Sequence, residues 1–424
     1  MILIYHILWT VIIICCSPFI LFLAIIGNNR IKERFALSLP KDHYEKQKIW
    51  IHALSVGEVM SAIPLVEAIR LKYRDKEIVF TATTAKGLDI ARKKIGDRLK
   101  VIPMPLDFWW SVQRIVRHIN PFLFILVETD IWPALITRLS DKNIKCFLVN
   151  GRISPRTSKS YKKFSFLIRP VLNKFTLCMM QSELDRKRLL EIGADGTRII
   201  TTGNIKFDRN WLPMHKEECG MWLKKLCLAP EDEIWVAGSI HGDEAQIILN
   251  VFSKLISFFP RLRLILAPRN IEESDKILKS ANDIGLETII RTSLKDNMIP
   301  YKVLILNTIG ELGRIYGLGR VSFVGGSLVP LGGHNILEPA SFGCPVLFGP
   351  HMHNFVFMSE LLLEEKGGFK VADEKELYAS VKMLLEDQKL CSITGRNAKE
   401  FTDKHKGALK EVLKRIGVHV NKAT

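Results

Sequence analysis

The stretch "FLFILVETDIWP", residues 122–133, decides the fold class of this chain. Its first six residues are apolar without interruption, and such a run of strand length is typical of a parallel strand covered on both faces. Glu128 and Asp130 follow at once. In open α/β sheets, ligands bind beyond the carboxyl ends of the strands. The stretch therefore predicts a buried strand that delivers acidic side chains to a functional edge.

Similar apolar runs recur along the chain and alternate with helical patterns, for example over residues 58–74 and 183–193. This βαβ rhythm predicts doubly wound parallel sheets. The rhythm pauses over residues 208–230 and then restarts, which predicts two domains with a cleft between them in a chain of 424 residues. The predicted strands span residues 48–54, 77–83, 100–104, 122–128, 145–150, 176–180, 198–203, 233–239, 262–268, 286–290, 302–307, 320–326 and 345–349.

The N-terminal residues 2–26 contain no Asp, Glu, Lys or Arg. Such a run is long enough to cross a bilayer as a helix. Arg30, Lys32 and Arg34 follow it, and basic residues stay on the cytoplasmic side. We therefore predict a single-pass N-terminal anchor, with a buried core helix or an apolar surface patch as the alternative. The eight cysteines form no C-x-x-C pair, which favours a reduced, cytoplasmic compartment for the rest of the chain.

The net charge of +17 indicates a polyanionic partner, which is a nucleic acid, an anionic membrane surface or an anionic substrate. Residues 151–175 carry seven basic side chains and no acidic one. We expect this segment to bind the phosphates of an acceptor or of lipid headgroups, with a solvated helix face as the alternative.

Three charged residues of the first half follow predicted strands. Glu58, in "HALSVGEV", begins a helix and could act as a general base; the helix dipole would lower its pKa, whereas burial would raise it. An exposed first-turn glutamate is the alternative. Glu128 is a second candidate acid, although helix capping by Asp130 would also explain the pattern. Lys206, in "TGNIKFD", could stabilise charge on a leaving phosphate.

In the second half, "RVSFVGGSLVPLGGHN" predicts a strand and two glycine turns, followed by a helix that opens around residues 335–339. Free N–H groups at that opening would attract phosphate, and Glu338 could bind a ribose diol. A capped helix with Glu338 at its positive end is the alternative. Arg269, in "LAPRN", could hold a phosphate. There is no G-K-[ST] ending and no G-x-G-x-x-G after the first strand, so ATPase and dehydrogenase functions are disfavoured.

Eight motifs together resemble the 3-deoxy-D-manno-octulosonic acid (Kdo) transferases. They are "HALSVGE", "ETDIWP", "NGRIS", "QSELDRKRLLEIGA", "TGNIKFD", "APR", "GELG" and "GGHNILEPASFGCPVLFGPHMHNF", and they run in the family's order from residue 52 to residue 355. The resemblance implies a GT-B fold, in which two Rossmann-like domains face each other across a cleft. It implies a membrane anchor at residues 1–27, an acceptor-binding domain at 28–207, and a CMP-sugar-binding domain at 208–424 whose last helix packs back on the first domain.

The resemblance further implies transfer of Kdo from CMP-Kdo to the lipid A precursor at the cytoplasmic face of the inner membrane, without a metal or other cofactor and with inversion. It assigns the general base to Glu58 and transition-state support to Glu128 and Lys206. The expected partners are the donor, the lipid acceptor and the anionic membrane, and no nucleic acid is expected. The residues it implies for CMP binding are Pro268, Arg269, Ile309, Gly310, Glu311, Asn335, Ile336, Leu337 and Glu338.

Three alternatives remain open from the sequence. The first is another GT-B transferase that uses a UDP-sugar for a membrane lipid acceptor. The second is a non-enzymatic basic protein that tethers nucleic acid to the membrane, which would interleave basic residues with exposed aromatics. The third is a UDP-sugar epimerase of the same fold, which would need no anchor.

Overall fold

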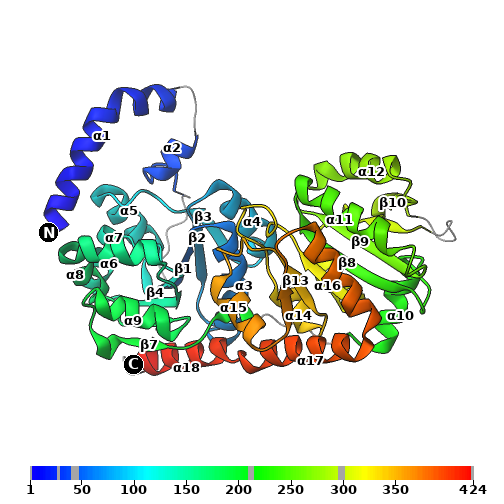
Figure 1. Ribbon diagram of the computed structural model, residues 1–424. Coiled ribbons are helices and arrows are strands. Elements are labelled where there is room, and N and C mark those ends of the chain that lie inside the picture. The colour runs from blue at the N-terminus through cyan, green and yellow to red at the C-terminus, as the bar shows by residue number, and fades with distance from the viewer. Residues whose placement is uncertain (1, 26–28, 40–46, 209–213, 295–300, 422–424) are drawn as a thin grey trace. The chain divides into compact units, whose positions relative to one another are not determined.

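The computed structural model describes residues 2–25, 29–39, 47–208, 214–294 and 301–421. The chain forms two compact units, one of Met1–Arg209 with Lys406–Thr424 and the other of Asn210–His405. Each unit contains one parallel seven-stranded sheet with helices on both faces (Figure 1). The predicted α/β class with two parallel sheets is therefore confirmed.

The sheet of the first unit has the strand order β3-β2-β1-β4-β5-β6-β7, and every pairing is parallel. The inner strand β1 pairs with β2 on one side and β4 on the other, so that Ile51 lies opposite both Phe80 and Ile125. The strands are β1 (Lys48–Ala53), β2 (Ile78–Ala82), β3 (Lys100–Pro103), β4 (Pro121–Val127), β5 (Lys145–Gly151), β6 (Leu177–Met180) and β7 (Ile199–Thr201).

Helices cover both faces of this sheet. One apolar cluster joins the sheet to α3, α4 and α18, and a second joins its other face to α5, α6, α8 and α9. The helices of this unit are α1 (Ile2–Ile25), α2 (Asn29–Arg34), α3 (Val56–Lys72), α4 (Ala85–Ile95), α5 (Trp109–Ile119), α6 (Pro133–Asp141), α7 (Pro155–Lys163), α8 (Ser165–Leu172), α9 (Glu183–Glu191), η1 (Gly196–Arg198), η2 (Ile205–Asp208) and α18 (Ala408–Asn421).

The second unit has the strand order β10-β11-β9-β8-β12-β13-β14. Its strands are β8 (Glu233–Ile240), β9 (Leu262–Pro268), β10 (Thr288–Ile290), β11 (Val303–Ile305), β12 (Val321–Val324), β13 (Val346–Phe348) and β14 (Gly368–Lys370). Its helices are α10 (Lys216–Lys225), α11 (Gly242–Leu255), η3 (Ile271–Glu273), α12 (Ser274–Asp283), η4 (Arg291–Ser293), α13 (Leu312–Ile315), η5 (Tyr316–Leu318), α14 (Leu337–Ser341), α15 (Val356–Glu364), α16 (Glu374–Glu386) and α17 (Gln388–Lys404). The thirteen predicted strands correspond to β1–β13, and β14 was not predicted.

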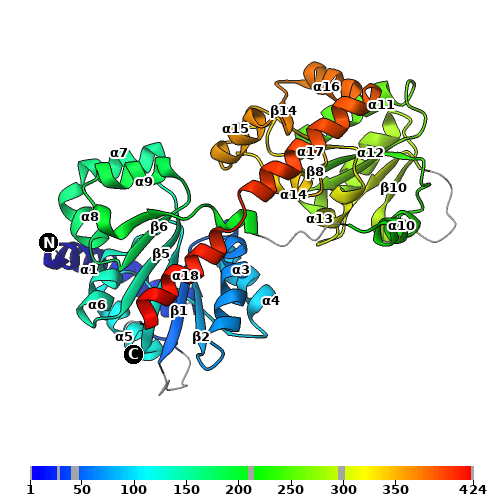
Figure 2. The same cartoon turned by 90° about the horizontal axis from the view of Figure 1, so that it is seen from below.

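The chain returns to the first unit through α18, which packs against α3 and η2 (Figure 2). Asp208 caps the start of α18, because its carboxylate accepts hydrogen bonds from the backbone N–H groups of Gly407 and Leu409 at 2.6 and 2.7 Å. Ala408, Val412 and Ile416 bury their side chains in the cluster that joins α3 to the sheet. The last helix is thus part of the core of the first unit.

The N-terminal apolar run forms helix α1, which packs on α6. Near its start, the Tyr5 hydroxyl donates to the carboxylate of the buried Asp107 at 2.8 Å. Asp107 also accepts hydrogen bonds from the N–H groups of Ala134 and Leu135 and so satisfies the first turn of α6. Among the described residues, no helix reaches the length and apolarity that crossing a membrane requires. The predicted transmembrane anchor is therefore not confirmed.

Candidate active site

Three predicted site residues lie on the carboxyl edge of the first sheet. Glu58 is in the first turn of α3, directly after β1; Glu128 directly follows β4; and Lys206 lies in η2, after β7. The structure brings the last two together, because the Nζ atom of Lys206 lies 2.8 Å from Oε1 of Glu128. Both side chains are largely buried, so the Coulomb attraction between them is less screened by water than that of a surface pair.

Glu58 has a perturbed acidity. Burial raises the pKa of its carboxyl to about 7, and the negative charges of Glu128 and Asp130 act in the same direction. Hydrogen bonds from the N–H groups of Leu54 and Ser55 oppose the shift only in part. Of the two opposing effects on the pKa of Glu58 that the sequence suggested, burial is therefore the larger. A carboxylate with this pKa is half-ionised near neutral pH, as a general base requires.

Glu128 has a left-handed backbone conformation, with φ of 63°. For an L-residue other than Gly or Asn this conformation costs about 1 kcal/mol, and it collects at functional sites. Its N–H still donates to the carbonyl of Val149, so the strained turn begins where the ladder between β4 and β5 ends. The conformation turns the chain out of the strand and leads into the loop that carries Thr129 and Asp130.

Asp130 is tied to neighbouring side chains and does not cap α6. Its Oδ2 atom accepts a hydrogen bond from Nε1 of Trp132 at 2.7 Å and lies 3.5 Å from Nε2 of the fully buried His52. The other ring nitrogen of His52 contacts the Thr81 hydroxyl at 2.8 Å. The capping alternative that the sequence left open is therefore wrong, because Asp107 fulfils that role. Asp107 and His52 were not predicted, since their partners are distant in sequence.

The second unit places its predicted residues at the carboxyl edge of the second sheet. Pro268 ends β9 and is buried, whereas Arg269 beyond it is exposed and its N–H donates to the carbonyl of Ile240. After β11, Ile309 is 85% exposed, which is unusual for an isoleucine, and Gly310 has φ of 98°, which favours glycine. Arg269, Ile309 and Gly310 are therefore open to a ligand from solvent.

Glu311 was predicted to contact a nucleotide, and its carboxylate is already engaged. Although burial opposes the shift, hydrogen bonds from Thr308, Lys225 and Arg291 lower its pKa to about 2. Arg291 donates from both Nε and Nη2 at 3.2 Å, in a bidentate pair. The carboxylate therefore fixes the loop after β11, which leaves the backbone of Ile309 and Gly310 as the part that could face a ligand.

The predicted glycine turn after β12 is held by a carboxylate that the sequence analysis did not single out. Glu244, in the first turn of α11, is fully buried. Its two oxygens accept hydrogen bonds from the N–H groups of Gly326, Ser327, Leu328 and His241, at 2.7 to 3.2 Å. The turn needs glycine because a Cβ at Gly325 would lie 2.4 Å from the carbonyl oxygen of Ser239. Three of the four donors to Glu244 lie more than 80 positions away, so in the sequence Glu244 looks like an ordinary first-turn acid.

Two histidines from separate loops meet beside this turn. The Nε2 atoms of His241 and His334 lie 2.9 Å apart, with their rings almost parallel. Burial lowers the pKa of His334 to about 4, and the positive charges of Arg269 and His241 add to the effect. The two imidazoles and the guanidinium of Arg269 therefore form one polar cluster between the ends of β8, β9 and β12.

The predicted helix opening around residues 335–339 corresponds to α14, which begins at Leu337. Helix α14 has only five residues, and Ile336 and Leu337 are buried in the core. Asn335 donates from Nδ2 to Glu338 at 3.3 Å, and its Oδ1 accepts from the N–H of Leu337 at 3.2 Å. The N–H group of Leu337, one of those expected to bind phosphate, is thus already bonded, and Asn335 and Glu338 carry partly exposed polar groups in this turn.

Two parallel sheets whose strand-following residues gather at the carboxyl edges define a class of two-domain α/β proteins that includes GT-B-like glycosyltransferases. A glycosyltransferase from Rickettsia africae matches 88% of this chain with a TM-score of 0.58 and 16% identity. A UDP-GlcNAc 2-epimerase from Neisseria meningitidis matches 87% with a TM-score of 0.59 and 12% identity. At these identities the likeness shows the fold alone.

The family model of the 3-deoxy-D-manno-octulosonic acid transferases matches residues 29–209. A 3-deoxy-D-manno-octulosonic acid transferase from Haemophilus influenzae is 32% identical over 96% of this chain and 96% of its own length. A bifunctional glycosyltransferase/methyltransferase from Fusobacterium nucleatum is 33% identical over 84% of this chain, which spans 55% of that longer protein. The chain belongs to the 3-deoxy-D-manno-octulosonic acid transferase family, so the resemblance of its motifs is confirmed, as is its class as a glycosyltransferase.

Glu244→Gln is expected to destabilise the second unit by about 2–4 kcal/mol, because an amide cannot accept from all four N–H groups and leaves donors unpaired. Urea denaturation followed by intrinsic fluorescence measures the change. Asp243→Asn, an exposed neighbour in the same helical turn, is the matched control and should change stability by less than about 0.5 kcal/mol. Equal stability of the two variants would contradict the conclusion that the Glu244 carboxylate holds the glycine turn.

Proposed function

We propose that the chain transfers Kdo from CMP-Kdo to a hydroxyl of the lipid A precursor, with inversion at the anomeric carbon and without a divalent metal. The observation that carries this proposal is the carboxyl of Glu58, buried at the carboxyl edge of the first sheet with its pKa raised to about 7. Membership of the Kdo transferase family supports the sugar and the donor. The positive net charge of the chain suits a phosphorylated acceptor and an anionic donor.

Glu58 is the general base in this proposal. Its carboxylate takes the proton of the acceptor hydroxyl while that oxygen forms a bond to the anomeric carbon of Kdo. The bond from the anomeric carbon to the phosphate oxygen breaks, and CMP leaves with the electron pair. The hydrogen bond from the N–H of Leu54 to Oε2 orients the carboxylate, so one oxygen is held and the other can receive the proton.

Glu128 and Lys206 support the transition state. The anomeric carbon gains positive charge as the bond to phosphate lengthens, and the negative charge of Glu128 suits that change. Lys206, whose Nζ lies 2.8 Å from Oε1 of Glu128, balances the charge of this carboxylate and supplies a cation for the departing phosphate. Partial burial of both groups strengthens these interactions.

The donor nucleotide binds the second unit. Arg269 is exposed at the end of β9 and suits the single phosphate of CMP. The exposed side chain of Ile309 and the open backbone at Gly310 suit the face of a cytosine ring. Asn335 and Glu338 carry the partly exposed polar groups that suit the ribose hydroxyls, while Pro268, Ile336, Leu337 and Glu311 shape the loops around them.

We further propose that α1 attaches the enzyme to the inner membrane that holds its acceptor, with the catalytic units in the cytoplasm. Ile7, Val11 and Ile14 lie on one face of α1 and are 52%, 52% and 64% exposed. Such a row of exposed apolar side chains on a helix suits the lipid boundary.

Glu58→Gln is expected to lower the transfer rate by about 10²- to 10⁴-fold, because the amide cannot take up the proton. For the wild-type enzyme, activity should rise with pH through about 7, since the base acts when it is deprotonated and its pKa is raised to that value. The assay incubates the protein with CMP-Kdo, lipid A precursor and EDTA and weighs the products by mass spectrometry.

Glu67→Gln, further along the same helix, removes an equal charge away from the sheet edge and is the control for Glu58→Gln. It should keep wild-type activity and the same pH profile. Transfer by Glu58→Gln at the wild-type rate would refute the assignment of the base, and loss of transfer in EDTA would refute metal independence.

A transferase that uses a UDP-sugar is the second candidate, because a structural neighbour of this chain is an epimerase bound to UDP-GlcNAc. We expect CMP to raise the melting temperature of the protein more than UDP does. Arg269→Ala should weaken CMP binding at least tenfold, which corresponds to the loss of one charge-assisted contact. The exposed Lys279→Ala in α12 is the charge-matched control. Stronger stabilisation by UDP than by CMP would favour the second candidate.

Replacing Ile7, Val11 and Ile14 by Asp should abolish binding to phosphatidylethanolamine–phosphatidylglycerol vesicles, since the charges oppose burial of α1 in lipid. Co-sedimentation measures the bound fraction. Leu71→Asp changes a 60% exposed apolar side chain on α3 and should leave binding unchanged. Vesicle binding that survives the triple substitution would refute attachment through α1.

A further inference from the structure

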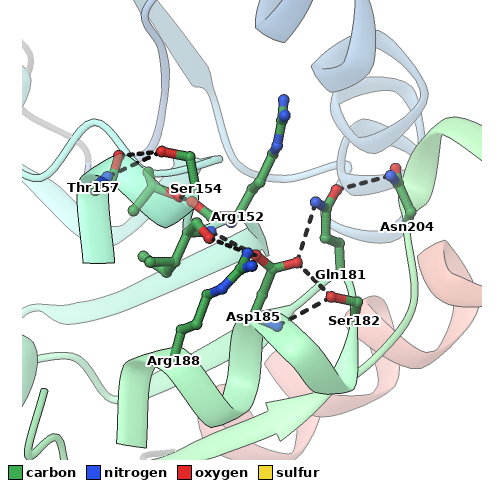
Figure 3. Close-up of polar contacts among 10 residues, drawn as sticks. Arg152, Ser154, Thr157, Gln181, Ser182, Asp185, Arg188 and Asn204 are labelled. Atoms are coloured by element: carbon green, nitrogen blue, oxygen red, sulfur yellow. Dashed lines mark hydrogen bonds and ion pairs between the residues drawn. The ribbon is translucent and has the colours of Figure 1, made fainter. Parts of the chain in front are cut away.

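A buried polar cluster around Asp185 lies outside the residues to which the mechanism assigns a role. Asp185 is in the first turn of α9 and is only 4% exposed. Removing a carboxylate from water is costly unless hydrogen bonds replace the lost hydration. Here backbone and side-chain donors from two further segments supply them (Figure 3). The side chain of Asp185 therefore contacts the loops that follow β5 and β6, and through Gln181 it is linked to the loop that follows β7.

One of these loops follows β5 and carries Arg152. Oδ1 of Asp185 accepts a hydrogen bond from the N–H of Ile153 at 2.7 Å, and Arg188 donates to the carbonyl of the same residue at 2.8 Å. The backbone of Arg152 is held from the other side, where its N–H donates to the Thr129 hydroxyl at 2.9 Å. Thr129 is the neighbour of Glu128. The side chain of Arg152 extends away from the cluster (Figure 3).

The other loop follows β7 and carries Lys206. Gln181 donates from Nε2 to Oδ2 of Asp185 at 3.3 Å, and its Oε1 accepts from Nδ2 of Asn204 at 2.8 Å. Oδ1 of Asn204 accepts in turn from the N–H of Lys206 at 3.0 Å. All three side chains of this relay are buried.

The charge of Asp185 fixes the direction of the whole relay. An ionised carboxylate only accepts hydrogen bonds, so Gln181 must turn its NH₂ towards Asp185 and its oxygen towards Asn204. Asn204 must then turn its NH₂ towards Gln181, which leaves its oxygen for the N–H of Lys206. A neutral amide in place of Asp185 removes this constraint and allows both amides to flip, which would set an NH₂ group against the N–H of Lys206.

We propose that Asp185 is a positioning residue for sugar transfer, which places Lys206 beside Glu128 through Gln181 and Asn204 and holds the loop of Arg152 in register with them. The inference rests on the proposed function for the roles of Lys206 and Glu128. It assigns to Asp185 no contact with substrate.

The positioning has an electrostatic consequence at Glu58. The charged groups that act on Glu58 are Glu128 and Asp130, while His52 on β1 contacts Asp130 and Lys206 on η2 neutralises Glu128. If the loop of Lys206 moves, the charge of Glu128 is compensated less. The carboxyl of Glu58 then becomes harder to ionise, so the acid limb of the pH–rate profile moves to higher pH.

The test compares Asp185→Asn with Glu183→Gln in the full-length protein. Glu183 lies in the same helical turn but is exposed, so the control removes the same charge without touching the relay. We expect Asp185→Asn to lower kcat at least tenfold and to move the acid limb upwards by half a pH unit or more. Glu183→Gln should keep both values. A kcat within twofold of wild type and an unmoved acid limb would overturn the inference, even if the melting temperature falls.

Gln181→Met is the second variant, for use if Asp185→Asn does not fold. It keeps the side-chain volume at position 181 and leaves the hydrogen bonds of Asp185 to other residues in place, but it breaks the link to Asn204. It should move the acid limb in the same direction.

A titration of the Glu58 carboxyl by ¹³C NMR measures the same pKa shift without substrate. The Glu58→Gln variant assigns the signal. Failure of the wild-type protein to transfer Kdo would refute the proposed function, whereas an unmoved Glu58 titration in both variants would refute the positioning role.

Discussion

Burial of both sheets on both faces is the constraint on which the rest of the structure depends. Apolar side chains fill most positions of the strands, as in β4, and the charged residues of the candidate site follow the ends of the strands. Because all strands of a sheet are parallel, their carboxyl ends share one edge, and Glu58, Glu128 and Lys206 come together although they are up to 148 positions apart. The chemistry of the chain is concentrated at two edges for the same reason that its cores are apolar.

Loops that leave such an edge have few partners of their own, and buried carboxylates fix them. Asp107, Asp185 and Glu244 are at most 4% exposed, and each accepts backbone N–H groups from a segment distant in sequence. A charged acceptor makes stronger hydrogen bonds than a neutral one, and it cannot reverse its role to become a donor. These carboxylates therefore specify one loop conformation each, and the cost of their burial is offset by donors that would otherwise remain unpaired.

The sequence predicted the elements that depend on local pattern. Thirteen strands were recognisable because each is a short apolar run bounded by turns, whereas β14, with the residues Gly368–Lys370, has only one large apolar side chain. The positions of Glu58, Glu128 and Arg269 after strands followed from the same pattern. The roles of Glu244 and Asp185 in holding loops were not predicted, because tertiary contacts bring their hydrogen-bond partners to them. The ion pairs of Glu311 could not be predicted from the sequence for the same reason.

The pKa of Glu58 depends both on its local sequence position and on tertiary contacts. Its place at a helix start is encoded locally, and the helix N-terminus and the N–H of Leu54 favour the ionised form. Burial and the charge of Glu128 favour the neutral form and prevail. Lys206 limits that second effect, because it pairs with Glu128 and not with Glu58. Burial is therefore the largest cause of the raised pKa of Glu58, and Lys206, which follows a strand at the far edge of the sheet, acts on Glu58 only through its ion pair with Glu128. The relay from Asp185 connects Lys206 to the core.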